Sequence, residues 1–195
     1  MLEKATPDRL SMFSDGIFAV LITVLVLDLH PPEEPTYHAM FALWHQWLSY
    51  GVSYLFIAIV WMNHHYLLRF AGEATPRLLW FNFAHLFSMS LLPISTEWMA
   101  VSGLSPEPVS FYAAVFFLVN LTYIALIREL IDRAPHHKIA PRLRRIMRIR
   151  SVTTLCLWGV ASLVALAAPL LGLAICIGCL LVYLKPDPPG ISAPP

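Results

Sequence analysis

Residues 9–29 of the chain read RLSMFSDGIFAVLITVLVLDL. After Asp15 this segment is apolar over the length of a transmembrane helix, which needs about 20 mostly apolar residues to cross the hydrocarbon core. A cleaved signal peptide is disfavoured, because an acid lies inside the stretch and no A-x-A cleavage site follows it. We therefore expect a retained membrane span from about Leu10 to Leu29.

The rest of the chain has the composition of a membrane protein. Of its 195 residues 58% are hydrophobic and 13% are charged, whereas soluble domains carry about 25% charged residues. We predict an all-α polytopic membrane protein in which residues 1–185 form a single six-helix transmembrane domain and residues 186–195 form a disordered Pro-rich tail. The expected spans are Leu10 to Leu29, Phe41 to Leu67, Leu78 to Met99 with a kink at Pro93, Val109 to Ile131, Ser151 to Ala167, and Pro169 to Leu184.

The charges predict the orientation of these spans. All 13 Lys and Arg residues lie in or beside the N-terminus, the loops after the second and fourth spans, and the C-terminus. The other loops carry only acids, namely Asp28, Glu33, Glu34, Glu97 and Glu107. Because basic residues concentrate on the cytoplasmic side, both termini are expected there, with the protein in the plasma or inner membrane of the cell. The net charge of +1 predicts no nucleic-acid partner.

The basic segment 133–150 has two interpretations. It is either a topology signal that lies on an anionic leaflet, or a site for a ligand or a lipid head group. Membrane lipids are partners under both interpretations.

Polar residues gather in the cytoplasmic third of the first three spans. Ionisable groups inside a membrane span are costly and therefore usually serve a function or a pairing. Asp15 is the natural acceptor of the cluster, and the basic, amide and indole groups are its donors. The predicted network comprises Arg9, Phe13, Ser14, Asp15, Trp61, Asn63, His64, His65, Trp80, Asn82 and His85.

Three interpretations of this network remain open. It is a structural network that holds the helices together, a proton or ion relay, or a metal site built from Asp15, His64, His65 and His85. The metal site is the weakest, because adjacent residues on a helix point about 100° apart and the i, i+4 histidine pair of helical zinc sites is missing from the cluster. We expect no bound metal and no cofactor.

The first helix also carries an apolar stripe. Val20, Val24 and Leu27 follow i, i+4, i+7 spacing, with Ile17 and Phe13 below them. Spacing alone leaves two interpretations, a face that packs against lipid or protein and a face that lines a pore. The hydroxyl of Thr23 could face a passing ion or bond back to its own helix.

Three motifs occur in order at fitting depths. Residues 9–16 read RLSMFSDG and match an RxxxFSD motif, residues 61–65 read WMNHH and match WxNHH, and the pair LWFN at 79–82 and SLLP at 90–93 follows. Together they resemble the transmembrane-protein-175 potassium channel family, in its shorter prokaryotic form with one six-helix repeat. The resemblance covers residues 9 to about 97.

The resemblance implies a potassium-permeable cation channel and not an enzyme. Four subunits would assemble as a homotetramer in which each first helix lines the pore. Val20, Val24 and Leu27 would form the constriction, with Ile17 and Thr23 as further candidate pore-lining residues and potassium as the permeant ion. The chain has no TVGYG loop of the kind whose carbonyls select potassium, so conduction would be passive through a hydrophobic constriction. The alternative function is a proton-coupled or metal-ion transporter that uses the Asp/His cluster.

Overall fold

The protein is described by a computed structural model that covers residues 6–132 and 141–183. Within these residues the chain forms α-helices and no β-strand, which confirms the all-α prediction. The helices are α1 Pro7–Leu27, α2 Tyr37–Ala42, α3 Trp44–Leu68, α4 Pro76–Ser90, α5 Leu92–Val101, α6 Pro106–Ile127, α7 Pro141–Ala165 and α8 Pro169–Tyr183, and a π-helical turn, η1 Arg128–Asp132, continues α6. The predicted Pro-rich tail lies outside the described residues.

Three of the long helices begin with the same local signal. Thr6, Thr75 and Ser105 occupy extended N-cap positions, and each is followed by a proline that opens the helix. The Thr6 hydroxyl accepts a hydrogen bond from the Arg9 amide, and Thr75 does the same for Leu78. Proline suits the first helical turn because its missing N–H would have no partner there, so these helices start where the sequence specifies.

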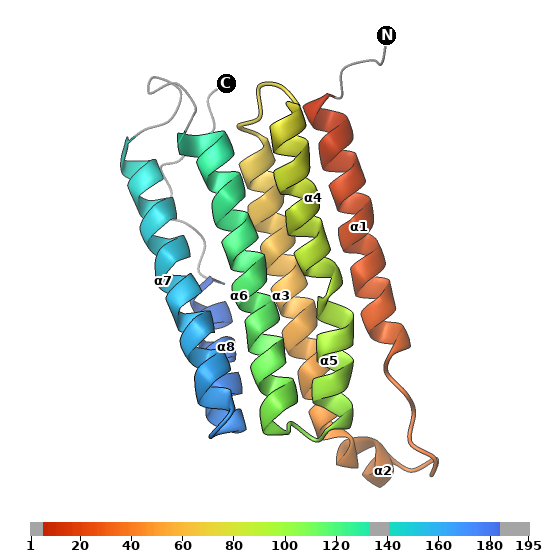
Figure 1. The fold of residues 1–195 in the computed structure, drawn as a ribbon. Helices are drawn as coiled ribbons and strands as arrows, with labels where there is room; N and C mark the ends of the chain where they lie inside the picture. Colours follow the sequence, from red (N-terminus) through yellow and green to blue (C-terminus); the bar gives the residue numbers. More distant parts are fainter. Residues whose placement is uncertain (1–5, 133–140, 184–195) are drawn as a thin grey trace.

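The helices lie side by side and alternate in direction (Figure 1). α1 forms one edge of the bundle and α7 with α8 forms the other, while α3, α4, α5 and α6 lie between them (Figure 1). The start of α1, the turn between α3 and α4 and the end of α6 lie at one end of the bundle, opposite α2 and the α7–α8 turn (Figure 1).

Several helices have the length and composition of membrane spans. Among residues 6–132 and 141–183, four segments qualify on both counts, Pro7–Leu27, Pro76–Val101, Pro106–Ile131 and Arg144–Ala165, and α8 is apolar but shorter. α3 has 25 residues, but its tryptophans, tyrosines and histidines lower its hydropathy. The chain is therefore a membrane protein.

The helix α7 begins before the fifth predicted membrane span. We expected it at Ser151, yet α7 starts at Pro141, within the basic segment. Arginine is a good helix former, so the helix extends through the basic residues instead of ending where the apolar stretch ends.

The third predicted span is broken where the kink was expected. α4 ends at Ser90, Leu91 caps it, and α5 starts at Leu92 with Pro93 in its first turn. Proline provides no amide for the hydrogen bond of a continuous helix and its ring displaces the preceding carbonyl. The interruption predicted at Pro93 is confirmed, and it divides the segment into two half-helices, α4 and α5.

The interior is held by aromatic rings and by close helix contacts. Phe56 of α3 stacks on Phe116 of α6 with ring centroids 3.6 Å apart, and Trp158 of α7 meets Phe116 edge-on at 4.9 Å. α7 and α8 approach closely at Gly172, where a Cβ would lie 2.6 Å from the Cβ of Ala165. Small residues let membrane helices pack closely when lipid is as apolar as their side chains.

Candidate functional site

α1 has one packed face and one open face. Leu10, Ser14, Phe18, Leu21 and Leu25 are buried against the bundle. On the other side Val20 is 56% exposed and Leu27 is 75% exposed. The open face is apolar and runs along the helix, so it is available for lipid, for another subunit or for a pore.

The predicted stripe lies on or beside this open face. Val24 and Ile17 are half-buried and flank the exposed Val20. Thr23 is exposed, and its hydroxyl donates a hydrogen bond of 2.7 Å to the Val20 carbonyl. Of the two alternatives for Thr23, the structure shows the bond back to its own helix.

Asp15 is joined to α3 by one hydrogen bond. The indole Nε1 of Trp61 donates to Asp15 Oδ1 at 2.8 Å. Trp61 is 40% exposed, so this contact lies at the edge of the open face and not in the core. The predicted pairing of the acid with an indole donor is confirmed.

A second branch of the network is fully buried. His64 Nε2 contacts Asn82 Oδ1 at 2.7 Å, Asn82 Nδ2 donates to Ser14 Oγ at 3.0 Å, and Ser14 Oγ donates to the Leu10 carbonyl at 2.9 Å. Because an amide oxygen can only accept, His64 carries its proton on Nε2. The branch links α3, α4 and α1 through a chain of hydrogen bonds in which each group donates to the next, from His64 to the Leu10 carbonyl.

His85 extends the buried cluster to α6. Its Nδ1 lies 3.0 Å from Thr122 Oγ1, and Ser88 Oγ lies 2.9 Å from the same oxygen. The His85 and His64 rings are nearly parallel, with centroids 5.5 Å apart. The network predicted from the sequence did not include Thr122 or Ser88, because each is a small polar residue in a mostly apolar span.

Five residues of the predicted network do not join this hydrogen-bonded cluster. The Arg9 and Trp80 side chains are exposed and form no hydrogen bond with it, and Phe13 contacts the Phe83 ring instead, at 5.7 Å. His65 contacts Trp61 and lies 3.5 Å from Arg69 Nη2. Asn63 faces α6.

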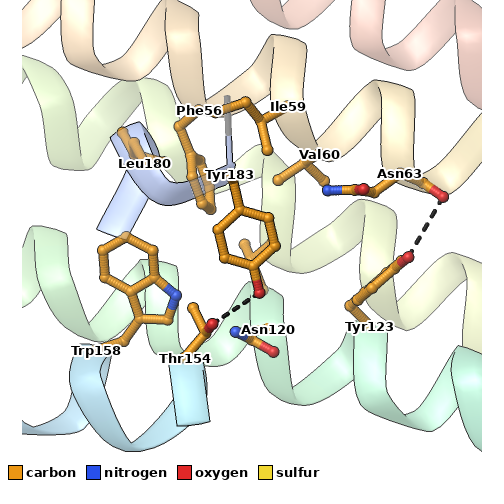
Figure 2. Close-up of a pocket in the computed structure, with 11 residues that line it drawn as sticks. Phe56, Ile59, Val60, Asn63, Asn120, Tyr123, Thr154, Trp158, Leu180 and Tyr183 are labelled. Carbon is orange, nitrogen blue, oxygen red and sulfur yellow. Dashed lines mark hydrogen bonds between the residues drawn. The ribbon is translucent and has the colours of Figure 1, made fainter. Parts of the chain in front are cut away.

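The surroundings of Asn63 form a cavity of their own. Asn63 lines it with Asn120, and the Tyr123 hydroxyl donates to the Asn63 backbone carbonyl at 3.3 Å (Figure 2). On another wall the Tyr183 hydroxyl meets Thr154 Oγ1 at 2.7 Å (Figure 2). The cavity lies among α3, α6, α7 and α8, away from α1.

A second buried polar cluster was not apparent from the sequence. Ser53 of α3 contacts Thr96 Oγ1 of α5 at 2.7 Å and the Tyr112 hydroxyl of α6 at 2.8 Å. All three residues are buried, with Thr96 the most exposed at 6%. This cluster lies beyond the α4–α5 break, so each half of the bundle has its own polar contacts.

The geometry gives no support to a metal site. Among the described residues no three His, Cys, Asp or Glu side chains are placed to hold a metal ion.

Beyond the end of α1, burial and the nearby Glu97 carboxylate raise the pKa of Asp28, and His30 opposes that effect.

Comparison with known proteins finds a similarity to one family of membrane channels. Residues 9–93 match the family model described as "Endosomal/lysosomal potassium channel TMEM175". Over these residues the chain is similar to the TMEM175 family. The family is one of ion channels rather than enzymes, as the sequence predicts.

Relatives and solved structures extend the match. A potassium channel of Chryseobacterium sp. (strain P1-3) is 35% identical over 121 residues, which cover 62% of this chain and 63% of that relative. The rat endosomal/lysosomal proton channel TMEM175 is 25% identical over 135 residues, 61% of this chain and 27% of the rat protein. The chain thus spans less than two thirds of the length of these relatives.

One solved TMEM175-family structure has the same fold. The crystal structure of a lysosomal potassium-selective channel TMEM175 homolog from Chamaesiphon minutus superposes with a TM-score of 0.81 at 20% identity, and covers 91% of this chain and 96% of that one. This likeness covers 91% of the chain and therefore extends beyond residue 93, where the match to the family model ends.

Proposed function

We propose that the chain is a subunit of a potassium-permeable cation channel whose pore is lined by α1. The observation that supports this most directly is the open face of α1, an exposed apolar surface on a helix whose other face is packed. The named potassium channel among the bacterial relatives supports the choice of ion.

The proposed constriction consists of Val20, Val24 and Leu27. The three positions lie within one narrow sector of α1, since they are four and seven residues apart on a helix of 3.6 residues per turn. Rings of such side chains provide no oxygens to replace an ion's water. They narrow the path and force partial dehydration, which favours potassium over the more strongly hydrated sodium.

Conduction on this scheme requires self-association. A single α1 offers one strip of apolar surface and cannot enclose a path, so several copies must surround a common axis. We propose a homotetramer with six spans per subunit, α1, α3, α4 with α5, α6, α7 and α8, and with both termini cytoplasmic. α1 can stand at the axis because it already occupies an edge of the bundle (Figure 1).

A cysteine-accessibility experiment tests the pore assignment. In a Cys156→Ser background, which removes the exposed native thiol, Val20→Cys and Leu27→Cys are reconstituted in liposomes and treated with a charged thiol reagent during potassium flux. Both variants should be blocked, because a bulky cation in a narrow ring obstructs the ion. Val26→Cys is the matched control, since Val26 is 47% exposed on another side of the helix and should not be blocked.

Block of Val26→Cys alone would place a different face of α1 at the pore. Modification of Val20→Cys and Leu27→Cys with undiminished flux would show that the stripe faces lipid.

The stacked histidines favour a second candidate function, proton transport. His64 is 1% exposed and His85 is 0% exposed, and in each ring one nitrogen lacks a hydrogen-bond partner among the described residues. Such nitrogens can accept a proton. A pH-sensitive dye inside liposomes tests this: dissipation of a proton gradient that is lost in His64→Phe and His85→Phe, without loss of potassium flux, would establish it.

A further inference from the structure

A groove between α7 and α8 has the character of an amphiphile site. It encloses about 370 Å³ and is walled by apolar side chains that include Leu157 and Ile175. Gly178 has no side chain, and no atom lies within 4 Å of the position that a Cβ would occupy there, so the groove is empty beside this residue. The space can therefore accept an elongated apolar group without displacing protein atoms.

One end of the groove carries a fixed cation. The Arg150 guanidinium lies 4.0 Å from the centroid of the Tyr183 ring, within the range of a favourable cation–π contact. The Tyr183 hydroxyl in turn meets Thr154 at 2.7 Å (Figure 2). This double contact holds the arginine at the end of the groove where α7 begins and α8 ends.

Further basic residues surround that end. Arg128 and Arg148 line a second cleft on the neighbouring side of α7 together with Ser151. The acid Glu129, next to Arg128 in the chain, forms an ion pair with Arg77 at 3.0 Å. Arginine side chains therefore line both clefts beside α7.

We propose that this groove binds an anionic phospholipid, with one acyl chain along Leu157, Gly178 and Ile175 and the lipid phosphate on Arg150. The apolar walls match an acyl chain, and the cation at one end matches the phosphate beside it. An arginine binds phosphate through a planar fork of N–H donors. The inference requires membrane insertion but not ion conduction, so a failed flux experiment leaves it intact.

Native mass spectrometry of the detergent-purified full chain tests the site. Phosphatidylglycerol and phosphatidylcholine of the same acyl composition are added separately, and bound lipid is counted at each concentration. Wild type should prefer phosphatidylglycerol. Arg150→Gln should weaken that preference by about fivefold, the effect of one basic residue near an anionic lipid, and should leave phosphatidylcholine binding unchanged.

Two matched controls accompany the charge variant. Arg145→Gln removes an exposed arginine of α7 that lines neither cleft and should keep the lipid preference. Arg150→Lys retains the charge and should keep most of it, whereas a purely structural role for Arg150 would not be rescued by lysine. Equal preference in wild type and Arg150→Gln would overturn the proposal.

A groove-filling pair tests the acyl contact. Gly178→Leu should reduce binding of both lipids, while Gly51→Leu, at another exposed glycine with open space around it, should not. Competition by soluble glycerol phosphate as effectively as by phosphatidylglycerol would show a phosphate site without an acyl contact and would overturn the lipid assignment. A changed oligomeric mass in Gly178→Leu with unchanged lipid binding would show that a second copy of the chain fills the groove, and this too would overturn it.

Discussion

The indole nitrogen of Trp61 lies 2.8 Å from Asp15 Oδ1 and ties α3 to the first turns of α1. A hydrogen bond to a charged group contributes about 1.5–3 kcal/mol. Trp61→Phe keeps an aromatic ring but removes the N–H donor, so we expect a lower melting temperature in detergent and a smaller oligomeric fraction, with an unchanged reversal potential. Trp80→Phe is the control, because Trp80 is 74% exposed and contributes no hydrogen bond to the cluster. Equal loss in both variants would remove the bond to Asp15 as the cause.

The buried serine of α1 should matter more than an exposed one. Ser14 is 0% exposed and accepts from Asn82, so Ser14→Ala leaves a buried amide donor without its acceptor, at a cost of about 1–3 kcal/mol. Ser90→Ala removes only an exposed bond to the Phe87 carbonyl and should change the free energy of unfolding by less than about 0.5 kcal/mol. Denaturation followed by circular dichroism measures both. A destabilised Ser90→Ala beside an unchanged Ser14→Ala would contradict the assignment.

The Thr23 hydroxyl should have little effect on permeation. Its proton is donated to the Val20 carbonyl, so Thr23→Val removes a local bond and keeps the side-chain shape. We expect the potassium-to-sodium permeability ratio to stay that of wild type, whereas Leu27→Ala should change it by widening the proposed constriction. Reversal potentials under bi-ionic conditions distinguish the two. A shift in Thr23→Val alone would mean that the hydroxyl, and not the apolar stripe, contacts the ion.

Substitution of leucine for two glycines of α8 should destabilise the protein at one position and leave its stability unchanged at the other. A Cβ at Gly172 would lie 2.9 Å from the Ala161 carbonyl oxygen as well as close to Ala165, while Gly178 has open space. Gly172→Leu should therefore force α7 and α8 apart and destabilise the protein by about 1–3 kcal/mol, as overpacking does. Gly178→Leu should leave the melting temperature near that of wild type. Similar melting temperatures for both variants would show that α7 and α8 do not approach as described.

On the proposed channel scheme, protonation of Asp28 at the end of α1 should weaken cation entry as the pH falls. This loss should begin at a higher pH than it would for an aspartate with an unperturbed pKa. Burial and Glu97 raise the pKa of Asp28, so as the pH falls Asp28 is protonated, and loses its charge, earlier than an unperturbed aspartate. Glu97→Gln removes one cause of the increase and should shift the midpoint of the flux–pH curve to lower pH. Asp28→Asn should abolish that titration step. A midpoint that does not move in Glu97→Gln would contradict the coupling between the two acids.

Helical phase explains which parts of the network the sequence could predict. Depth along the spans correctly brought Asp15 to Trp61 and Ser14 to Asn82, because all lie near the same end of the bundle. Depth alone could not exclude Asn63, which is two residues from Trp61 and so points about 200° away from it. The same angle separates Trp80 from Asn82.

Other parts of the structure left no pattern in the sequence. Thr122 joins the histidine cluster from α6, but a single threonine in an apolar span carries no sign of the helix it faces. The early start of α7 was missed for a different reason, since hydropathy marks where a lipid-compatible stretch begins and not where the backbone becomes helical. The helix register that sets these contacts depends on packing between distant segments.

The break at Leu91 makes the α4–α5 segment two short rods joined end to end. One rod carries Asn82 and His85, the other carries Thr96, and each is tied by side-chain hydrogen bonds to α3 or α6. A tilt of the rod that carries Asn82 and His85 therefore need not be transmitted rigidly to the rod that carries Thr96. The half of the bundle around Asn82 can therefore move, together with the part of α1 that is bonded to it, while the half around Thr96 stays in place.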